Sequence, residues 1–315
     1  MALSTRQGPC RLTSHEKGSN VNTSARSTVV VGVDGTRDGE RAIRYGIALA
    51  SREDLDVRLV HVPHEMEFYA PMLPYVEMAT VREIGQEVLR EAAKQAEETG
   101  LDAGRTTTML SAGPRGAALV RAAEDARYIV LGTRTSAVQH LLTGATSLSV
   151  VAHSSVPVHC VPPSWVAERS PSGRLVVGLD GSDADPEVLA EAFTEASTRG
   201  ASLEMVHAWR PVSPYDVSIA GRVLRDDWDK ATREALTRRI EEVSAGHPRV
   251  EWTLRLEFER VPVALHEAAV NADLLVLGRH GHHPVLGLLV GSNTRTLVHN
   301  APCAVAVVPV PSDDQ

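Results

Sequence analysis

The sequence predicts an α/β protein made of two tandem doubly wound, Rossmann-like domains, each a five-stranded parallel sheet with helices on both faces. Three observations predict this fold. The chain has 315 residues, and at about 150 residues per domain that length suits two domains. The first half of the sequence recurs in the second half at an offset of 146 residues. Within each copy, short apolar runs alternate with helical stretches, as in parallel sheets covered on both faces.

The repeat is visible in several markers that keep one order. Residues 30–36, VVGVDGT, recur as residues 176–182, VVGLDGS. At the same offset His61 recurs as His207, and the run 129–132 recurs as 275–278. This period is far longer than the ~20 to 50 residues of a solenoid repeat, so each copy is expected to be a domain with its own core.

The first copy opens with a βαβ unit. Residues 28–33 and 57–62 are rich in β-branched side chains and predict two strands, while residues 38–52 carry apolar side chains at helical spacing between them. The same reasoning predicts the remaining elements of this copy: helices at 81–98, 116–126 and 147–154, and strands at 105–110, 128–131 and 158–162.

Composition shifts give the domain boundaries. Residues 1–26 are polar and predict a disordered tail, and residues 164–173 are polar and predict a linker. The two domains are therefore expected at residues 27–163 and 174–315.

Net charge and lysine content limit the classes of molecule that the protein is expected to bind. Lys+Arg 32 against Asp+Glu 40 gives a net charge of -8, which disfavours nucleic acid and anionic membranes as partners. The only lysines are Lys17, Lys94 and Lys230, so an anion site must rely on backbone N–H groups or arginine.

The location is inferred from what the sequence lacks. No apolar run reaches the ~18 residues that span a bilayer, and no secretory signal opens the chain. The 3 cysteines have no CxxC spacing, which argues against a disulfide framework or a cysteine zinc site. Cys160 and Cys303 are expected to be small buried hydrophobes. A cytoplasmic protein fits these observations best.

A glycine-containing loop follows the fourth predicted strand of the second copy. It carries Gly278, Gly281 and Gly291, with Ser292 directly after the last glycine and a helical pattern beyond. Glycine lets the backbone approach an anion, Ser292 can cap the helix, and a helix N-terminus favours negative charge. The pattern predicts a phosphate cradle without lysine, although glycines before a serine N-cap also form ordinary turns.

At these residues the sequence resembles the universal stress protein family. The spacing Gly278-x2-Gly281-x9-Gly291-Ser292 matches the nucleotide motif of its ATP-binding members, and residues 177–182 look like the family's first strand and turn. The resemblance implies an ATP site, with Mg²⁺ able to accompany the phosphates. It places Asp180 and Ala208 at the nucleoside. It also implies a wider set of site residues: Gly178, Leu179, Leu277, Gly278, Arg279, His280, Gly281, Gly291, Ser292 and Asn293.

The first copy departs from this motif. Thr135 and Ala145 stand where the second copy has glycines, and their Cβ atoms would intrude on closely held phosphates. We therefore predict ATP binding mainly in the second domain. The weaker candidate residues of the first domain are Val33, Asp34, Val62, Gly132 and Thr146.

Three alternatives qualify the site. Asp180 can equally form an Asx-turn, as Asp-Gly-Ser sequences do after strands. A metal site is conceivable at the loop histidines His280, His282 and His283. Adjacent loop histidines are more often solvated, however, and no metal site is predicted. His61 and His207 each end an apolar strand and are read most simply as polar residues at a sheet edge, with catalysis as a minor alternative.

The last predicted strand of each copy is apolar and would form an exposed sheet edge if unpaired. Members of the family commonly dimerise through this strand, so the resemblance implies an intramolecular pseudo-dimer of the two domains, and a homodimer of whole chains stays open. The favoured function is a nucleotide-binding regulator in a stress response. The alternatives are a slow ATP hydrolase or phosphotransferase, at most weakly active, and a nucleotide-free interaction scaffold.

Overall fold

The computed structural model describes residues 27–63, 78–133, 145–167, 170–182, 185–209, 220–279 and 290–310. The predicted tail at residues 1–26 lies outside this part of the chain. The elements of the first half are β1 Thr28–Gly32, α1 Arg37–Glu53, β2 Asp56–His61, α2 Met78–Glu98, the short 3-10 helix η2 Ala103–Arg105, β3 Thr106–Leu110, α3 Arg115–Arg121, β4 Ala126–Gly132, α4 Ala145–His153 and β5 Val158–Val161.

The second half repeats this order. Its elements are β6 Arg174–Leu179, α5 Asp185–Arg199, β7 Ser202–Ala208, α6 Ala220–Ser244, β8 Trp252–Glu257, α7 Val261–Ala269, β9 Leu274–Gly278, α8 Ser292–Asn300 and β10 Ala304–Val308. No helix of the described residues is long and apolar enough to cross a bilayer.

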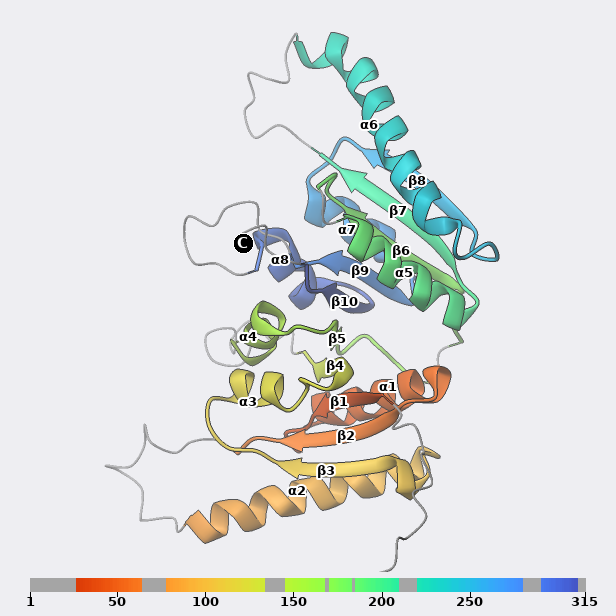
Figure 1. The fold of residues 1–315 in the computed structure, drawn as a ribbon. Coiled ribbons are helices and arrows are strands. Elements are labelled where there is room, and N and C mark those ends of the chain that lie inside the picture. Colours follow the sequence, from red (N-terminus) through yellow and green to blue (C-terminus); the bar gives the residue numbers. More distant parts are fainter. Residues whose placement is uncertain are drawn as a thin grey trace, which may run out of the picture.

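The strands of the described residues form one ten-stranded sheet with the order β3-β2-β1-β4-β5-β10-β9-β6-β7-β8 (Figure 1). Within each half the paired strands are parallel, which confirms the two predicted five-stranded arrangements. The halves meet through their last strands, because β5 and β10 pair in antiparallel orientation with Cys160 opposite Val305. The predicted pseudo-dimer is therefore one continuous sheet.

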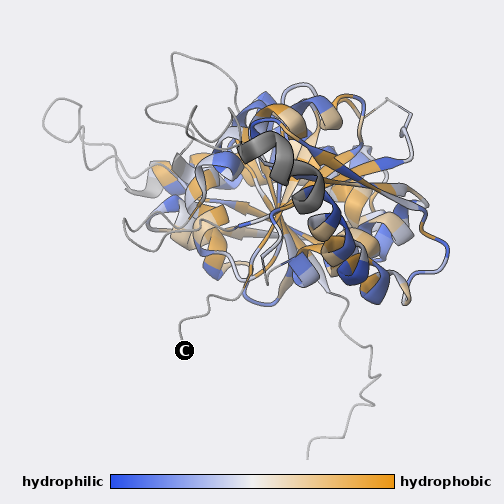
Figure 2. Ribbon diagram, turned by 90° about the horizontal axis from the view of Figure 1, so that it is seen from above, coloured by the Kyte–Doolittle hydropathy of each residue, from blue (hydrophilic) through white to orange (hydrophobic). Residues whose placement is uncertain are grey.

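Helices cover both faces of this sheet. On one face α1, α2, α5 and α6 pack over side chains such as Val29 and Val31, and on the other α3, α4, α7 and α8 pack over Val30. Apolar residues gather along the strands, and hydrophilic ones colour the outer faces of the helices (Figure 2). Each of the two core layers contains residues from both halves. The expectation of a separate core for each domain was wrong, because the β5–β10 pairing makes both layers continuous.

One predicted boundary is also wrong. The helix expected at residues 116–126 ends at Arg121, and residue 126 already begins β4. The Arg58 guanidinium of β2 donates to Ala122 O (2.8 Å) and pairs with Asp125 (2.7 Å), so it binds the carbonyl where the helix stops. The stretch 117–126 has no glycine or proline, and a stop produced by a distant arginine leaves no local signal.

A ring of polar side chains crosses the boundary between the halves, and we call it the boundary ring. It joins Tyr45 of α1 and His159 of β5 to Glu195 and Arg199 of α5. Arg199 donates to Glu195 Oε2 (2.6 Å) and to the Tyr45 hydroxyl (3.2 Å), which in turn lies 2.9 Å from His159 Nδ1. His159 Nε2 closes the ring at 3.4 Å from Glu195 Oε1.

The contacts of the ring fix its proton positions. Because the Tyr45 hydroxyl accepts from Arg199, it donates its own proton to His159 Nδ1, and Nε2 of the neutral imidazole carries the other proton toward Glu195. Burial lowers the pKa of His159 to about 4 against the opposing effect of Glu195. Burial acts against the charge of Glu195, but the Arg199 guanidinium lowers the pKa of this carboxyl below its usual value. The ring therefore holds an ionised Glu195–Arg199 pair beside a neutral histidine.

Candidate functional site

The candidate site lies where the strand order reverses. β6 and β9 are parallel neighbours, with Gly178 opposite Leu277, and the chain continues from them toward opposite edges of the sheet. In open parallel sheets ligands bind outside the carboxyl ends of strands at such a switch point. The first half has the same arrangement at β1 and β4.

The predicted residues of the second half that the structure describes gather at this end of the sheet. Asp180 follows β6, Ala208 ends β7 and Gly278 ends β9. The start of α8 is tied to the end of β9, because the Thr294 hydroxyl donates to Gly278 O at 3.3 Å. The start of α8 therefore lies beside the end of β9. His280 and Gly281, and the neighbouring His282 and His283, lie outside the described residues.

The Asp180 side chain forms the turn that the sequence left as an alternative. Its Oδ1 accepts from Ser182 N at 2.9 Å, and Asp34 accepts from Thr36 N at 3.0 Å in the first half. Gly181 has a φ of +80°, a backbone conformation that favours glycine. Asp180 itself is exposed, so the turn presents its carboxyl group at the carboxyl end of β6.

Two histidines hold the backbone just before these turns. His61 Nδ1 donates to Val33 O at 2.7 Å, and His207 Nδ1 donates to Leu179 O at 3.0 Å. Both side chains are buried, and burial lowers the pKa of His207. They are thus anchors of the strand ends and not merely polar residues at the end of the sheet. Their recurrence at the offset of 146 was the sequence signal for this shared role.

The start of α8 differs from the prediction in one respect. Gly291, with extended φ and ψ of -60° and 151°, is the N-cap, and Ser292 is the first helical residue. The expectation that Ser292 caps the helix was wrong, because the extended residue that ends the loop is Gly291. Ser292 and Asn293 are exposed, and among the described residues no side chain caps the first turn. The first N–H groups of this nine-residue helix have no partner within the helix itself.

Gly178 and Leu179 contribute differently from the turn. A Cβ atom on Gly178 would lie 2.7 Å from Leu277 Cδ2 and 2.9 Å from Leu265 Cδ1, so this glycine allows β6 to pack under α7. Leu179 and Leu277 are both buried in the core. Gly178, Leu179 and Leu277 therefore position the strand ends through packing in the core.

Arg279 reaches the other half of the molecule. Its Nη1 donates to Ser154 O at 2.6 Å, just beyond the end of α4, and its backbone N–H donates to Val308 O at 2.9 Å. Burial lowers the pKa of this guanidinium. In this structure the Arg279 side chain therefore connects the end of β9 to the first half, at the carboxyl end of a helix where a cation is favoured.

At the switch point of the first half, the end of β4 and the start of α1 are in close contact. A Cβ atom on Gly132 would overlap Asp38 O, so the end of β4 packs directly on the first turn of α1. Val33 and Val62 are buried, Asp34 is exposed and Thr146 is half-buried in α4. Thr135 lies outside the described residues.

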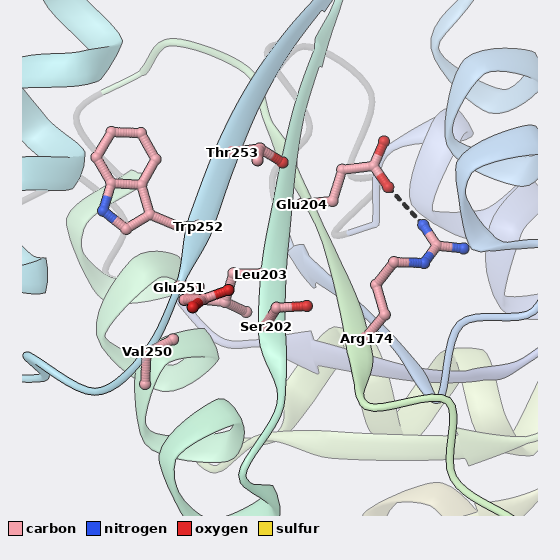
Figure 3. Close-up of a pocket in the computed structure, with 8 residues that line it drawn as sticks. All are labelled: Arg174, Ser202, Leu203, Glu204, Val250, Glu251, Trp252 and Thr253. Carbon is pink, nitrogen blue, oxygen red and sulfur yellow. Dashed lines mark hydrogen bonds and ion pairs between the residues drawn. The ribbon is translucent and has the colours of Figure 1, made fainter.

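A hollow of about 640 Å³ lies at the opposite end of the strands, lined by Arg174, Ser202, Leu203, Glu204, Val250, Glu251, Trp252 and Thr253 (Figure 3). Glu204 is paired twice here: Arg174 pairs with one of its oxygens, and Arg255 lies 3.1 Å from the other. The hollow opens beside the amino ends of β6, β7 and β8, where the sheet offers no switch point. We therefore place the candidate site at the carboxyl ends.

No group of three or more histidine, cysteine, aspartate or glutamate side chains suited to a metal ion occurs in the described part of the chain. Cys160 and Cys303 are both buried, as predicted, and burial raises the pKa of Cys160 to about 12. The Cys160 thiol is therefore protonated at neutral pH.

The fold and its paired switch points define a tandem doubly wound α/β protein. The chain belongs to the universal stress protein family, whose sequence profile matches residues 25–162 and 172–309. It is 30% identical over 295 residues to a universal stress protein of Mycolicibacterium smegmatis, covering 91% of this chain and 99% of the relative. It is 29% identical over 307 residues to one of Mycobacterium tuberculosis, covering 90% and 96%. A crystal structure of a universal stress protein from Archaeoglobus fulgidus has the same tandem fold, with a TM-score of 0.64, 18% identity, and 91% and 97% of the two chains covered.

Proposed function

We propose that the second half binds a nucleotide, ATP, at the switch point between β6 and β9, and that its occupancy has a regulatory role in a stress response. The observation that carries the proposal is the first turn of α8, which has no side-chain cap among the described residues and which Thr294 ties to the end of β9. Backbone N–H groups at a helix N-terminus attract phosphate, which suits a chain with 3 lysines.

The nucleoside end of the site is supported by the Asp180 turn. A carboxylate after the first strand of a doubly wound sheet can accept hydrogen bonds from ribose hydroxyl groups. Asp180 is exposed, and His207 donates a hydrogen bond to the carbonyl oxygen of Leu179, the residue before it.

The two halves are not equivalent in this proposal. The end of β4 packs directly on α1, and Thr135 and Ala145 replace the glycines of the motif. Both features disfavour closely held phosphates in the first half, so we assign one ATP to each chain.

Binding fits the described residues better than turnover. Asp185 is the carboxyl group whose pKa burial raises to about 6, the range expected of a general base. Its two oxygens, however, accept from the amides of Asp180 and Gly181. The Asp185 carboxyl group therefore stabilises the turn and is not placed to activate an attacking water.

Equilibrium dialysis with labelled ATP tests the proposal, with Asp180→Ala and Asp34→Ala as a matched pair in the two halves. We expect one ATP bound per chain, binding lost in Asp180→Ala, and binding retained in Asp34→Ala. Two equivalent sites, or loss only in Asp34→Ala, would contradict the assignment.

Native mass spectrometry of the purified protein separates the three functional classes. Bound ATP supports the regulator. Bound ADP together with release of phosphate supports a slow hydrolase. An empty protein whose melting temperature is unchanged by ATP supports a nucleotide-free scaffold.

A further inference from the structure

We propose that Asp185 and Arg239 form a clamp that holds the turn at residues 180–182 in the shape that binds the nucleoside, and that this clamp exists in the second half alone. The inference rests on the proposed function, which it extends by two positioning residues. Asp185 begins α5 and Arg239 lies in α6, so the clamp reaches the turn from two helices.

The clamp holds the polar backbone groups of the turn from both sides. Asp185 accepts from Asp180 N at 3.3 Å and from Gly181 N at 3.0 Å. Arg239 Nη1 donates to Gly181 O at 3.1 Å and to Ser182 O at 2.7 Å. The same Nη1 lies 3.4 Å from Asp185 Oδ2, so the two side chains of the clamp also pair with each other. Donors and acceptors of three consecutive residues are thereby fixed by side chains outside the turn.

The burial of Asp185 makes a purely structural role unattractive. The residue is 2% exposed, and burial together with the charge of Asp180 raises the pKa of its carboxyl to about 6. A carboxyl whose pKa is raised in the folded state destabilises the fold at neutral pH, where it must ionise. Charged groups retained against stability are typical of functional sites.

The first half cannot form the same clamp. The residue equivalent to Asp185 at the offset of 146 is Gly39, and a Cβ atom there would lie 2.9 Å from Asp34 Oδ1. The stretch of α2 that corresponds to Arg239 has Ala92 and Ala93, which have no charge. The turn of the first half relies on Thr36, whose hydroxyl donates to Asp34 Oδ1 at 2.6 Å. The difference in the clamp thus adds to the difference in the glycine motif.

Titration of the full-length protein with ATP tests the clamp. We expect Asp185→Asn and Arg239→Met each to raise the Kd for ATP about tenfold or more, since each removes charge-assisted hydrogen bonds. Glu187→Gln and Arg238→Met are matched controls, because they remove exposed charges of the same kind from α5 and α6. Both controls are expected to bind ATP like the wild type.

A second readout separates positioning from folding. In thermal unfolding at pH 7.5, Asp185→Asn is expected to melt at or above the wild-type temperature while its Kd rises. Wild-type affinity in Asp185→Asn and Arg239→Met would overturn the clamp and leave the proposed function intact. A Kd that rises only in proportion to lost thermal stability would also overturn it. A wild-type protein that fails to bind ATP would overturn both.

Discussion

His159 Nε2 and Glu195 Oε1 lie 3.4 Å apart, both side chains are 0% exposed, and the two residues belong to different halves of the chain. An imidazole and a carboxylate in this setting are stable only because Tyr45 and Arg199 complete the boundary ring. Three hydrogen bonds, from Arg199 to Glu195, from Arg199 to Tyr45 and between Tyr45 and His159, link α5 to α1 and β5. The ring therefore selects one position of α5 against α1 and β5.

Removal of Arg199 should destabilise the protein strongly. Arg199→Met leaves the Glu195 carboxylate buried without its charged partner, and we expect the free energy of unfolding in urea to fall by about 3–5 kcal/mol. Arg90→Met is the control, because Arg90 pairs with Glu87 on the surface with side-chain exposures of 70% and 64%. Its loss should change stability by less than about 1 kcal/mol. Equal effects in the two variants would contradict a stabilising role for the ring.

Acid should weaken the fold through His159. Burial lowers the pKa of this residue to about 4 in the folded protein, from about 6.5 when unfolded; Glu195 opposes this shift, and Arg199, Arg52 and Arg127 add to it. Between these values the unfolded chain binds a proton that the folded chain excludes. The stability from His159 is thus complete above about pH 6.5 and is lost as the pH falls toward 4, by about 3 kcal/mol.

Urea unfolding of the wild type and of His159→Gln between pH 7 and pH 4.5 measures this contribution. We expect the wild type to lose more stability than the variant over this range. Parallel curves would show that another group is responsible.

Gly178 should be intolerant of a methyl group. In Gly178→Ala the added carbon would overlap Leu277 and Leu265, so we expect the free energy of unfolding to fall by about 1–3 kcal/mol. Gly246→Ala is the control, since the nearest atom to a Cβ there is Val243 O at 3.6 Å. Its change should stay within about 0.5 kcal/mol, as for other surface positions. A harmless Gly178→Ala would argue against close packing of β6 under α7.

Arg279→Met should weaken the connection between the halves. The variant loses the bond from Arg279 Nη1 to Ser154 O, a charged hydrogen bond worth about 1.5–3 kcal/mol. Arg295→Met removes an exposed arginine of α8 and serves as the control. We expect hydrogen exchange of the α4 and β5 amides to accelerate in Arg279→Met alone. Unchanged exchange in both variants would contradict the connection.

Most of the fold was predictable because its strands are short, apolar and repeated. Buried parallel strands have no polar face, so runs such as 129–132 stand out between helical stretches. The repeat then fixed the second half from the first, and the switch point followed from the order of the elements. The location of the candidate site needed no information beyond this.

The charged groups between the halves were not predictable. Glu195 and Arg199 follow one another at helical spacing, as they would on a solvated helix face. Arg199 contacts Tyr45, which is 154 residues away, and no local pattern reports such a partner. Asp185 was missed for a related reason, since its contacts depend on the turn geometry and on Arg239 from another helix. The sequence signal that could have found it is the contrast with Gly39.

The antiparallel pairing of β5 with β10 joins the two copies within a single polypeptide. A tether of this kind replaces association between molecules by a contact whose effective concentration is in the ~mM range, so dilution does not separate the copies. It also removes a constraint that acts on symmetric dimers, in which every substitution appears at both sites. Here a single codon can change one site and spare the other, as aspartate at position 185 and glycine at position 39 illustrate. The fused architecture thus allows the two switch points to change independently.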